Sequence, residues 1–345
     1  METGFIFYRE KPELFNQYWQ EYFENNQVSP QYSLISLEYF RAYSIKFASD
    51  QSFVYLKNRK PVALAFLPIE KIDGEKSITS GGSFTLAPIF IQQDSIEEEV
   101  MAQLDTIART EKVAKIMFRI DPLERQYHYN FFLHYDYLDA SILGYLVDCK
   151  NITLRRNHQR AIRKITVDTN FSLYLMDKNN SDYQIHEEYR QLHHKAAGKI
   201  TRPKASFDLQ FKMLEAGQVI LVGLKYRERF VAFTYFGYNA DKALSFSASD
   251  DPEFDHWPLY HIINAEAFKY FQRCGVKAVD MGQPLNRSPQ ILYYPDDKQK
   301  NIALFKTGFG GNFVNNFRAV KYFSQPIFRQ DLADFIRIYE TSIKE

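Results

Sequence analysis

The stretch Leu56-Lys57-Asn58-Arg59-Lys60-Pro61-Val62-Ala63 recurs in the second half of the chain, one residue longer, as Leu224-Lys225-Tyr226-Arg227-Glu228-Arg229-Phe230-Val231-Ala232. In both places a polar turn separates two apolar or β-branched runs, which is the pattern of a β-hairpin. The copies start about 168 residues apart, an interval too long for a solenoid repeat and suited to a duplicated domain. We therefore expect the chain to contain one folding unit twice.

The elements that flank the two hairpins follow a similar order. In the first copy we expect helices at 12–25 and 37–48, the hairpin at 52–57 and 61–69, a strand at 77–79 or 84–91, a helix at 95–111 and a strand at 115–120. In the second copy we expect a basic helix at 154–165, a strand at 171–176, helices at 182–197 and 207–216, the hairpin at 219–225 and 230–238, a strand at 243–248, a helix at 256–273 and a strand at 277–281.

This order predicts an α/β (α+β) fold. A strand–helix–strand unit is normally a right-handed parallel crossover, so each copy should form a mixed sheet with helices on its faces. The length of 345 residues is enough for two cores. We place the two domains at residues 1–150 and 151–345.

The composition excludes several classes of protein. With 45% hydrophobic and 25% charged residues the chain is globular, and a net charge of +1 gives no overall field for nonspecific nucleic-acid binding, so we expect no nucleic-acid partner. Cys149 and Cys274 are far apart and form no metal-binding spacing, which predicts neither a disulfide framework nor a metal site. The sequence shows no signal-peptide pattern and no membrane span, so we expect a cytoplasmic protein, and a homodimer is left open.

Three stretches of the second copy carry a family resemblance. They are the basic helix Arg155-Arg156-Asn157-His158-Gln159-Arg160-Ala161-Ile162-Arg163-Lys164, the strand end Val279-Asp280-Met281-Gly282 and the segment Phe305-Lys306-Thr307-Gly308-Phe309-Gly310-Gly311. In this order they resemble the Fem family of peptidoglycan acyl-adding enzymes and the FemAB-like branch of the GNAT acyltransferases. The resemblance implies tandem GNAT-like domains, an acyl or aminoacyl donor and an amine acceptor. The broader GNAT resemblance implies coenzyme A as the carrier of the acyl group, and the first copy becomes a wall of the acceptor cleft.

A GNAT-like fold would hold the donor's pyrophosphate on the free N–H groups at the start of the main helix. Here that place comprises Phe254, Asp255, His256, Trp257, Pro258 and Leu259, our candidate residues for binding acyl-CoA. The sequence departs from the family pattern, because residues 249–258 contain four carboxylates and no glycine-rich cradle. The alternative is structural: Asp255 would cap the helix and Pro258 would lie in its first turn.

Three residues are candidates for catalysis. Asp280 follows a buried strand, where a carboxylate could hold or deprotonate an ammonium, or could simply cap the turn at Gly282. Lys306 lies in the Phe/Gly-rich segment, from which its ammonium could reach an acyl oxygen or a phosphate. His194 could be a general base near neutral pH, or a cationic cap at a helix end.

The remaining candidates would bind the acceptor. Arg156, Arg160 and Arg163 lie on one face of the basic helix at i, i+4 spacing and could grip a diphosphate, although a solvated basic face is as good an interpretation. Phe309 is a further candidate for substrate binding.

The leading hypothesis is an N-acyltransferase that moves an acyl group from acyl-CoA to the amine of a nucleotide-linked amino sugar or related cell-envelope precursor. No zincin, EF-hand, α/β-hydrolase, P-loop or dinucleotide-binding motif is present. Two alternatives are kept: a Fem-like transferase that takes an amino acid from aminoacyl-tRNA to a peptidoglycan precursor, and a non-catalytic protein that binds a glycan or a protein.

Overall fold

The computed structural model describes residues 3–91, 93–124, 128–282 and 285–343. The helices of these residues are α1 (Pro12–Asn26), α2 (Leu34–Tyr43), α3 (Asp94–Thr110), α4 (Arg156–Thr166), α5 (Tyr183–Ala197), α6 (Lys204–Glu215), α7 (Leu259–Arg273), α8 (Asp297–Lys306) and α9 (Gln325–Ser342). Their strands are β1 (Gly4–Phe7), β2 (Phe47–Asp50), β3 (Phe53–Lys57), β4 (Lys60–Ala65), β5 (Pro68–Ile72), β6 (Glu75–Ile78), β7 (Thr85–Leu86), β8 (Ile89–Phe90), β9 (Val113–Arg119), β10 (Leu138–Asp139), β11 (Ile142–Asp148), β12 (Phe171–Met176), β13 (Val219–Tyr226), β14 (Arg229–Asn239), β15 (Lys242–Asp250), β16 (Ala278–Asp280), β17 (Asn312–Asn316) and β18 (Arg318–Tyr322).

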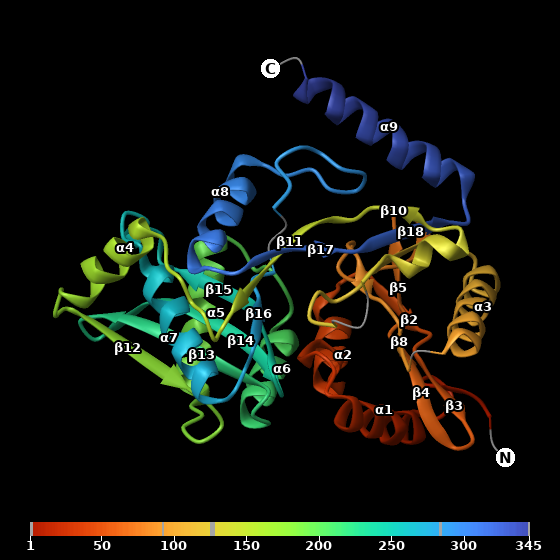
Figure 1. Cartoon of the computed structure of the whole chain (residues 1–345), viewed down its shortest axis with the longest axis horizontal. Coiled ribbons are helices and arrows are strands. Elements are labelled where there is room, and N and C mark those ends of the chain that lie inside the picture. Colours follow the sequence, from red (N-terminus) through yellow and green to blue (C-terminus); the bar gives the residue numbers. More distant parts are fainter. Residues whose placement is uncertain (1–2, 92, 125–127, 283–284, 344–345) are drawn as a thin grey trace.

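Two α/β halves lie side by side, and the described residues form three sheets (Figure 1). The first half holds the sheet β1-β3-β4-β8 and the sheet β10-β18-β9-β6-β5-β2, with β7 beside β9. The second half holds the sheet β12-β13-β14-β15-β16-β11-β17. Parallel pairs such as β6/β9 and β15/β16 lie among antiparallel ones, so the expected mixed α/β fold is confirmed.

Both hairpins form where the repeated stretch predicts them. The β3–β4 turn places Asn58 and Arg59 at φ 54° and 64°, and the β13–β14 turn places Arg227 at φ 56°. Two neighbouring boundaries were wrong. The hairpin strand expected to reach residue 69 ends at Ala65, because the chain then enters β5 in the other sheet, and the helix expected at 37–48 is α2, which Ser33 caps and which gives way to β2.

The two halves exchange strands. β11 precedes residue 150 but pairs with β16 and β17 in the second half's sheet. β18 comes from near the end of the chain and lies between β9 and β10 in the first half's sheet. The division at 150/151 stays a prediction, and each half contains a strand from the other side of it.

The segment after α8 contains glycines where its backbone lies too close to neighbouring residues to leave room for a side chain. A Cβ added at Gly308 would lie 2.0 Å from the His158 ring of α4. A Cβ added at Gly311 would lie 2.1 Å from the Leu146 carbonyl oxygen of β11. The segment is thereby seated between α4 and β11, next to the end of β16.

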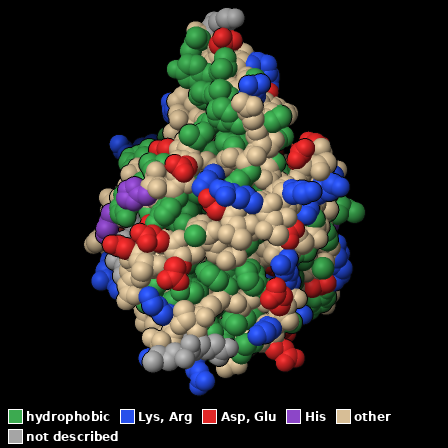
Figure 2. All heavy atoms as spheres, turned by 90° about the vertical axis from the view of Figure 1, so that its right-hand side faces the viewer, with side chains coloured by type: hydrophobic (Ala, Val, Ile, Leu, Met, Phe, Trp, Pro, Cys, Tyr) green, Lys and Arg blue, Asp and Glu red, His purple; other side chains and the backbone are tan. Residues whose placement is uncertain are grey.

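The last helix projects from the body of the molecule. α9 packs mainly beside β18, and Figure 2 shows hydrophobic side chains on the projecting end that it forms. Ile336 and Tyr339 remain 47% and 43% exposed. Among the residues that the structure describes, no helix combines the length and apolar character that crossing a bilayer requires.

Candidate active site between the two halves

A cavity of about 320 Å³ lies where the two halves meet. The first half contributes Gln31, three aromatic residues of α2, the segment around β7 and Arg119 at the end of β9. The second half contributes the bend of β15 and the end of β16, and the strands β17 and β18 close the cavity. The lining residues are Gln31, Tyr39, Phe40, Tyr43, Ser80, Phe84, Thr85, Leu86, Arg119, Leu244, Ser245, Phe246, Asp280, Gly282, Asn316 and Arg318.

The cavity exists because two parallel strands separate. β15 and β16 pair only from Lys242 to Leu244, with Leu244 opposite Asp280. Beyond that point β15 carries a bulge at Phe246, since Tyr235 of β14 faces Ser247 and Phe236 already faces Ser245. A bulge bends its strand and ends regular pairing, so the space beside Asp280 stays open. Crevices at the carboxyl ends of parallel strands are common ligand sites in α/β proteins.

Asp280 lies at the end of β16 and lines this cavity, with only 9% of its surface exposed. Burial, with a smaller contribution from Asp121, raises the pKa of its carboxyl group to about 6. Its Oδ1 also accepts a 2.8 Å hydrogen bond from the Gly282 N–H. Both interpretations of Asp280 therefore agree with its position: it caps the turn, and it presents a carboxyl group to a crevice. Gln283, which follows, lies outside the described residues.

Lys306 is the last residue of α8 and lies behind the same strand end. Its Nζ donates a hydrogen bond to the carbonyl oxygen of Met281. Burial lowers the pKa of the Lys306 ammonium to about 8, while the neighbouring Asp280 opposes that shift. Lys306 is thus close to Asp280 but is not among the residues that line the cavity.

Two arginines face each other on the opposite wall. Arg119 of β9 and Arg318 of β18 are direct cross-strand partners, and both line the cavity. Among the described residues neither guanidinium has a carboxylate within ion-pair distance; Arg119 donates to the Gln31 side chain, and Arg318 lies 4.9 Å over the Phe84 ring. Burial and the neighbouring Arg119 lower the pKa of Arg318, although a guanidinium stays charged at neutral pH.

Several buried polar atoms of the cavity wall lack a hydrogen-bond partner among the described residues. They are Oγ1 of Thr85, Oδ1 of Asn316 and Nε of Arg318. Buried polar groups in folded proteins are nearly always satisfied, and an orphan group calls for an explanation. A polar ligand in the cavity would supply the missing partners.

The predicted donor segment differs locally from expectation. α7 begins at Leu259 with Pro258 in the capping position and no side-chain cap, so the alternative in which Asp255 caps this helix is wrong. Asp251 instead caps the short 3-10 turn Pro252–Phe254. The helix start therefore keeps N–H groups that no side chain satisfies.

Basic side chains neutralise part of the acidic run before α7. Lys195 and Arg229 lie 2.8 Å and 3.0 Å from the Asp251 carboxylate, and both also pair with Glu253. The carboxyl group of Asp250 accepts a hydrogen bond from Tyr260. These partners reduce the repulsion that the run would exert on a phosphate.

The basic helix adjoins the donor segment but not the cavity. Lys164 of α4 lies 4.2 Å over the Trp257 ring. Arg156, Arg160 and Arg163 are exposed on α4, and none of them lines the cavity. Their proposed grip on a diphosphate would thus concern a ligand on the outer surface near α7.

Two other candidates lie apart from the cavity. His194 is half-buried on α5, where burial and then Arg190 lower the pKa of its ring, which disfavours a cationic helix cap. Phe309 is fully buried in the hydrophobic core beside Phe268 and the His158 ring. Its position indicates packing, and its predicted contact with substrate has no geometric support.

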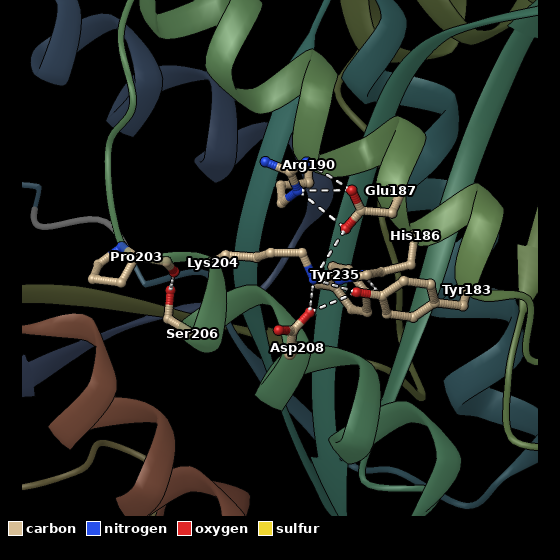
Figure 3. Close-up of polar contacts among 9 residues, drawn as sticks. All are labelled: Tyr183, His186, Glu187, Arg190, Pro203, Lys204, Ser206, Asp208 and Tyr235. Carbon is tan, nitrogen blue, oxygen red and sulfur yellow. Dashed lines mark hydrogen bonds and ion pairs between the residues drawn. The ribbon is translucent and has the colours of Figure 1, made fainter.

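A second polar cluster lies between α5 and α6. Ligand atoms of His186, Glu187 and Asp208 come within 4.8 Å of one another, a spacing that could hold a metal ion. Figure 3 shows the Lys204 side chain reaching between the two carboxylates, with Nζ 2.7 Å from Asp208 and 3.8 Å from Glu187. Arg190 pairs with Glu187 as well. Lys204 and Arg190 therefore already neutralise the two carboxylates to which a metal ion would bind.

Sequence reasoning missed most of the cavity wall. Arg119 is the last residue of β9, a strand that was predicted. A charged residue at the end of an apolar strand, just before Asp121, could have marked Arg119 as a candidate for ligand binding. Asn316 and Arg318 belong to strands that were not predicted. Only the pairing register shows that Arg318 lies beside Arg119.

Comparisons with known proteins support the architecture. No protein-family model matches the sequence, and no curated protein matches it significantly. Solved structures similar to this chain include FemX, with 12% identity, a TM-score of 0.63 and coverage of 96% of this chain and 99% of that chain. L-PGS from Bacillus licheniformis is 13% identical, with a TM-score of 0.62 and coverage of 94% of this chain and 96% of that chain. A tandem GNAT protein from the clavulanic acid biosynthesis pathway is 12% identical, with a TM-score of 0.51 and coverage of 93% of this chain and 98% of that chain. The chain therefore has the tandem GNAT-like fold that FemX and L-PGS share.

Proposed function

We propose that this protein is a transferase that moves an acyl group onto an amine bound in the cavity between the two halves. The observation that carries the proposal is Asp280: a buried carboxyl group, with a pKa raised to about 6, at the point where β15 and β16 separate. A carboxylate of this basicity is better suited to accept a proton near neutral pH than an ordinary aspartate.

The chemistry requires the acceptor nitrogen to lose its extra proton before it attacks. The Asp280 carboxylate would take one proton from the ammonium, and the free amine would attack the carbonyl carbon of the donor's thioester. A C–N bond then forms and the C–S bond breaks; the nitrogen gives up a second proton as the leaving thiolate takes one, so that the products are an amide, a free thiol and one proton. Lys306 lies outside the cavity lining, and its ammonium would act on the reaction through the neighbouring Asp280 carboxylate.

We favour acyl-CoA as the donor. The thioester arm would lie in the gap between β15 and β16, and the pyrophosphate would lie at Phe254–Leu259, where the start of α7 has no side-chain cap. The acceptor expected from the sequence, a nucleotide-linked amino sugar or related envelope precursor, would place its anionic part on Arg119 and Arg318, but a cavity of about 320 Å³ would enclose only part of such a ligand.

One observation favours an aminoacyl-tRNA donor instead. Arg156, Arg160 and Arg163 form an exposed basic face outside the cavity, on the helix α4 whose Lys164 lies over the Trp257 ring. Such a face could bind a phosphate backbone, and its binding would weaken steeply with salt. In this alternative the aminoacyl ester replaces the thioester, and the acceptor site is unchanged.

The test combines donor binding with turnover. Acetyl-CoA and a long-chain acyl-CoA should raise the melting temperature, and a free thiol should be released in the presence of an amine acceptor. Asp280→Asn should abolish thiol release while acyl-CoA binding remains. Asp297→Asn, whose carboxylate is 93% exposed, serves as the matched control and should retain activity.

Absence of binding and of thiol release with every acyl-CoA would reject the coenzyme A donor. Salt-sensitive tRNA binding that Arg160→Ala weakens would then favour the aminoacyl-tRNA alternative. Full activity of Asp280→Asn would contradict the role of the cavity in either case. A protein without turnover that binds a glycan or a protein partner would support the non-catalytic alternative.

A further inference from the structure

We propose that the acceptor held in the cavity is a free α-amino acid with an aromatic or large apolar side chain. This inference rests on the proposed function for the transfer step, but the recognition of the ligand is argued from the cavity wall alone. The wall offers a site for a carboxylate, a site for an ammonium and several aromatic rings, all within one small volume.

The carboxylate site is the pair Arg119 and Arg318. Like charges directly opposite each other on neighbouring strands destabilise a sheet, and here neither has a carboxylate partner among the described residues. An anion between them would remove this repulsion. It would also give the orphan Nε of Arg318 an acceptor, since guanidinium groups bind carboxylates with two parallel hydrogen bonds.

The ammonium site lies next to the arginine pair. Asn316 is two residues before Arg318, lines the same cavity, and has a buried Oδ1 without a donor among the described residues. Asp280 lines the same cavity; the charge of Arg119 lowers the pKa of the Asp280 carboxyl group, and the charge of Asp280 raises the pKa of Arg318. A ligand that presents an ammonium and a carboxylate a few ångströms apart would satisfy all of these groups together. An α-amino acid has that arrangement.

Aromatic rings form a further part of the wall. Phe40, Tyr43, Phe84 and Phe246 line the cavity together with Tyr39, whose hydroxyl already accepts a hydrogen bond from Arg202. Tyr39 therefore presents its ring rather than a free hydroxyl acceptor. These rings suit an aromatic or large aliphatic side chain.

The size of the cavity separates an amino acid from a nucleotide-linked sugar. Small-molecule sites span roughly 300–1,000 Å³, and the cavity, at about 320 Å³, is at the lower end. A nucleotide-linked sugar contains two sugar rings, a base and a diphosphate, and most of it would extend out of a cavity of this volume. A single aromatic amino acid fits the observed volume.

The transfer step would then convert the amino acid into its N-acyl derivative. Asp280 accepts one ammonium proton, the nitrogen bonds to the thioester carbon, and coenzyme A leaves as the thiol. The product keeps the carboxylate on the arginine pair and loses the positive charge that Asp280 and Asn316 would hold. This loss weakens the product's hold on the site relative to the substrate.

The experiment is calorimetric titration of the full chain with three related ligands. L-Phenylalanine should bind, whereas phenethylamine, which lacks the carboxylate, and 3-phenylpropionate, which lacks the amine, should each bind at least tenfold more weakly. Arg318→Met should weaken L-phenylalanine binding at least tenfold and leave phenethylamine binding nearly unchanged. Arg329→Met on exposed α9 is the matched control and should behave like the wild-type chain.

A second variant tests the ammonium site without changing charge. Asn316→Leu should weaken L-phenylalanine but not 3-phenylpropionate. Equal binding of the three ligands by the wild-type chain, or binding of a UDP-linked amino sugar and not of L-phenylalanine, would overturn the inference. Binding of L-phenylalanine without transfer from any donor would instead contradict the proposed function and leave the amino-acid site standing.

Discussion

Arg119 and Arg318 are direct cross-strand neighbours on β9 and β18, both half-buried at the wall of the cavity without a carboxylate partner among the described residues. Opposite like charges cost a sheet about 0.2–1 kcal/mol, and burying a guanidinium adds to that cost. Such an arrangement sacrifices stability in the free protein. It resembles many binding sites, in which the charge that recognises a ligand is unfavourable until the ligand arrives.

We expect Arg318→Met to raise the free energy of unfolding by about 1 kcal/mol, because it removes one of two facing charges and keeps an unbranched side chain of similar length. Urea denaturation at pH 7.5 measures this difference. Arg329→Met should change the free energy of unfolding by less than about 0.5 kcal/mol, since its side chain is exposed. A loss of more than about 1 kcal/mol in Arg318→Met would show that the arginine is structural.

We expect kcat/KM to rise with pH through about 6 and then level off. The free protein must carry an ionised Asp280 to accept a proton, and burial raises the pKa of this carboxyl group to about 6. The measurement is thiol release at low acceptor concentration between pH 5 and 8.5. If Asp280→Asn retained thiol release with an unaltered acidic limb, the titration would belong to another group.

We expect Asp280→Asn to be more stable than the wild-type protein at pH 8, by about 2 kcal/mol. The folded-state pKa of about 6 lies above the unfolded value of about 3.9, so the folded protein binds this proton more tightly. Wild-type stability should therefore fall as pH rises from about 4 to about 6 and remain lower above that. Denaturation at pH 8 and at pH 4.5 checks the sign: the advantage of the variant should shrink at the lower pH. A variant less stable at pH 8 would mean that the carboxylate's contacts outweigh its burial.

We expect Gly308→Ala to cost at least about 3 kcal/mol of stability, because the added Cβ would lie 2.0 Å from the buried His158 ring. Removing that ring should relieve the clash, so the double variant Gly308→Ala, His158→Ala should lose less stability than the sum of the single variants. Thermal unfolding of the three variants gives the comparison. Strict additivity would indicate that the glycine is needed for a reason other than its contact with His158.

The duplicated α/β fold could be predicted because local patterns carry it. The repeated hairpin, the strand at 171–176 and the helix at 182–197 depend on apolar periodicity and turn residues within short windows. The short strands β10, β17 and β18 have no such pattern. Their conformation depends on partners more than a hundred residues away, as in the pairing of β18 with β9.

The candidate site was predictable only in part. Asp280 and Lys306 each belong to a motif of consecutive residues, and the structure places both residues at the end of the same strand. Arg119 and Arg318 are far apart in the sequence, and the residues between them do not show that they meet. Phe309 stands in the same contiguous segment as Lys306 and was therefore predicted to contact the substrate. In the structure the glycines beside it pack closely, and its ring lies in the hydrophobic core.

The exchange of strands between the halves has a consequence for biosynthesis. β18 separates β10 from β9 within a sheet, yet it is synthesised long after both of them, so a nascent chain that has left the ribosome up to residue 300 holds an unfinished sheet. The vacant edge of β9 would be exposed to pairing with other chains during that interval. Complete folding of the first half must therefore wait until β18 has been synthesised, and gene fragments cut near residue 150 should yield two aggregation-prone pieces rather than two working domains.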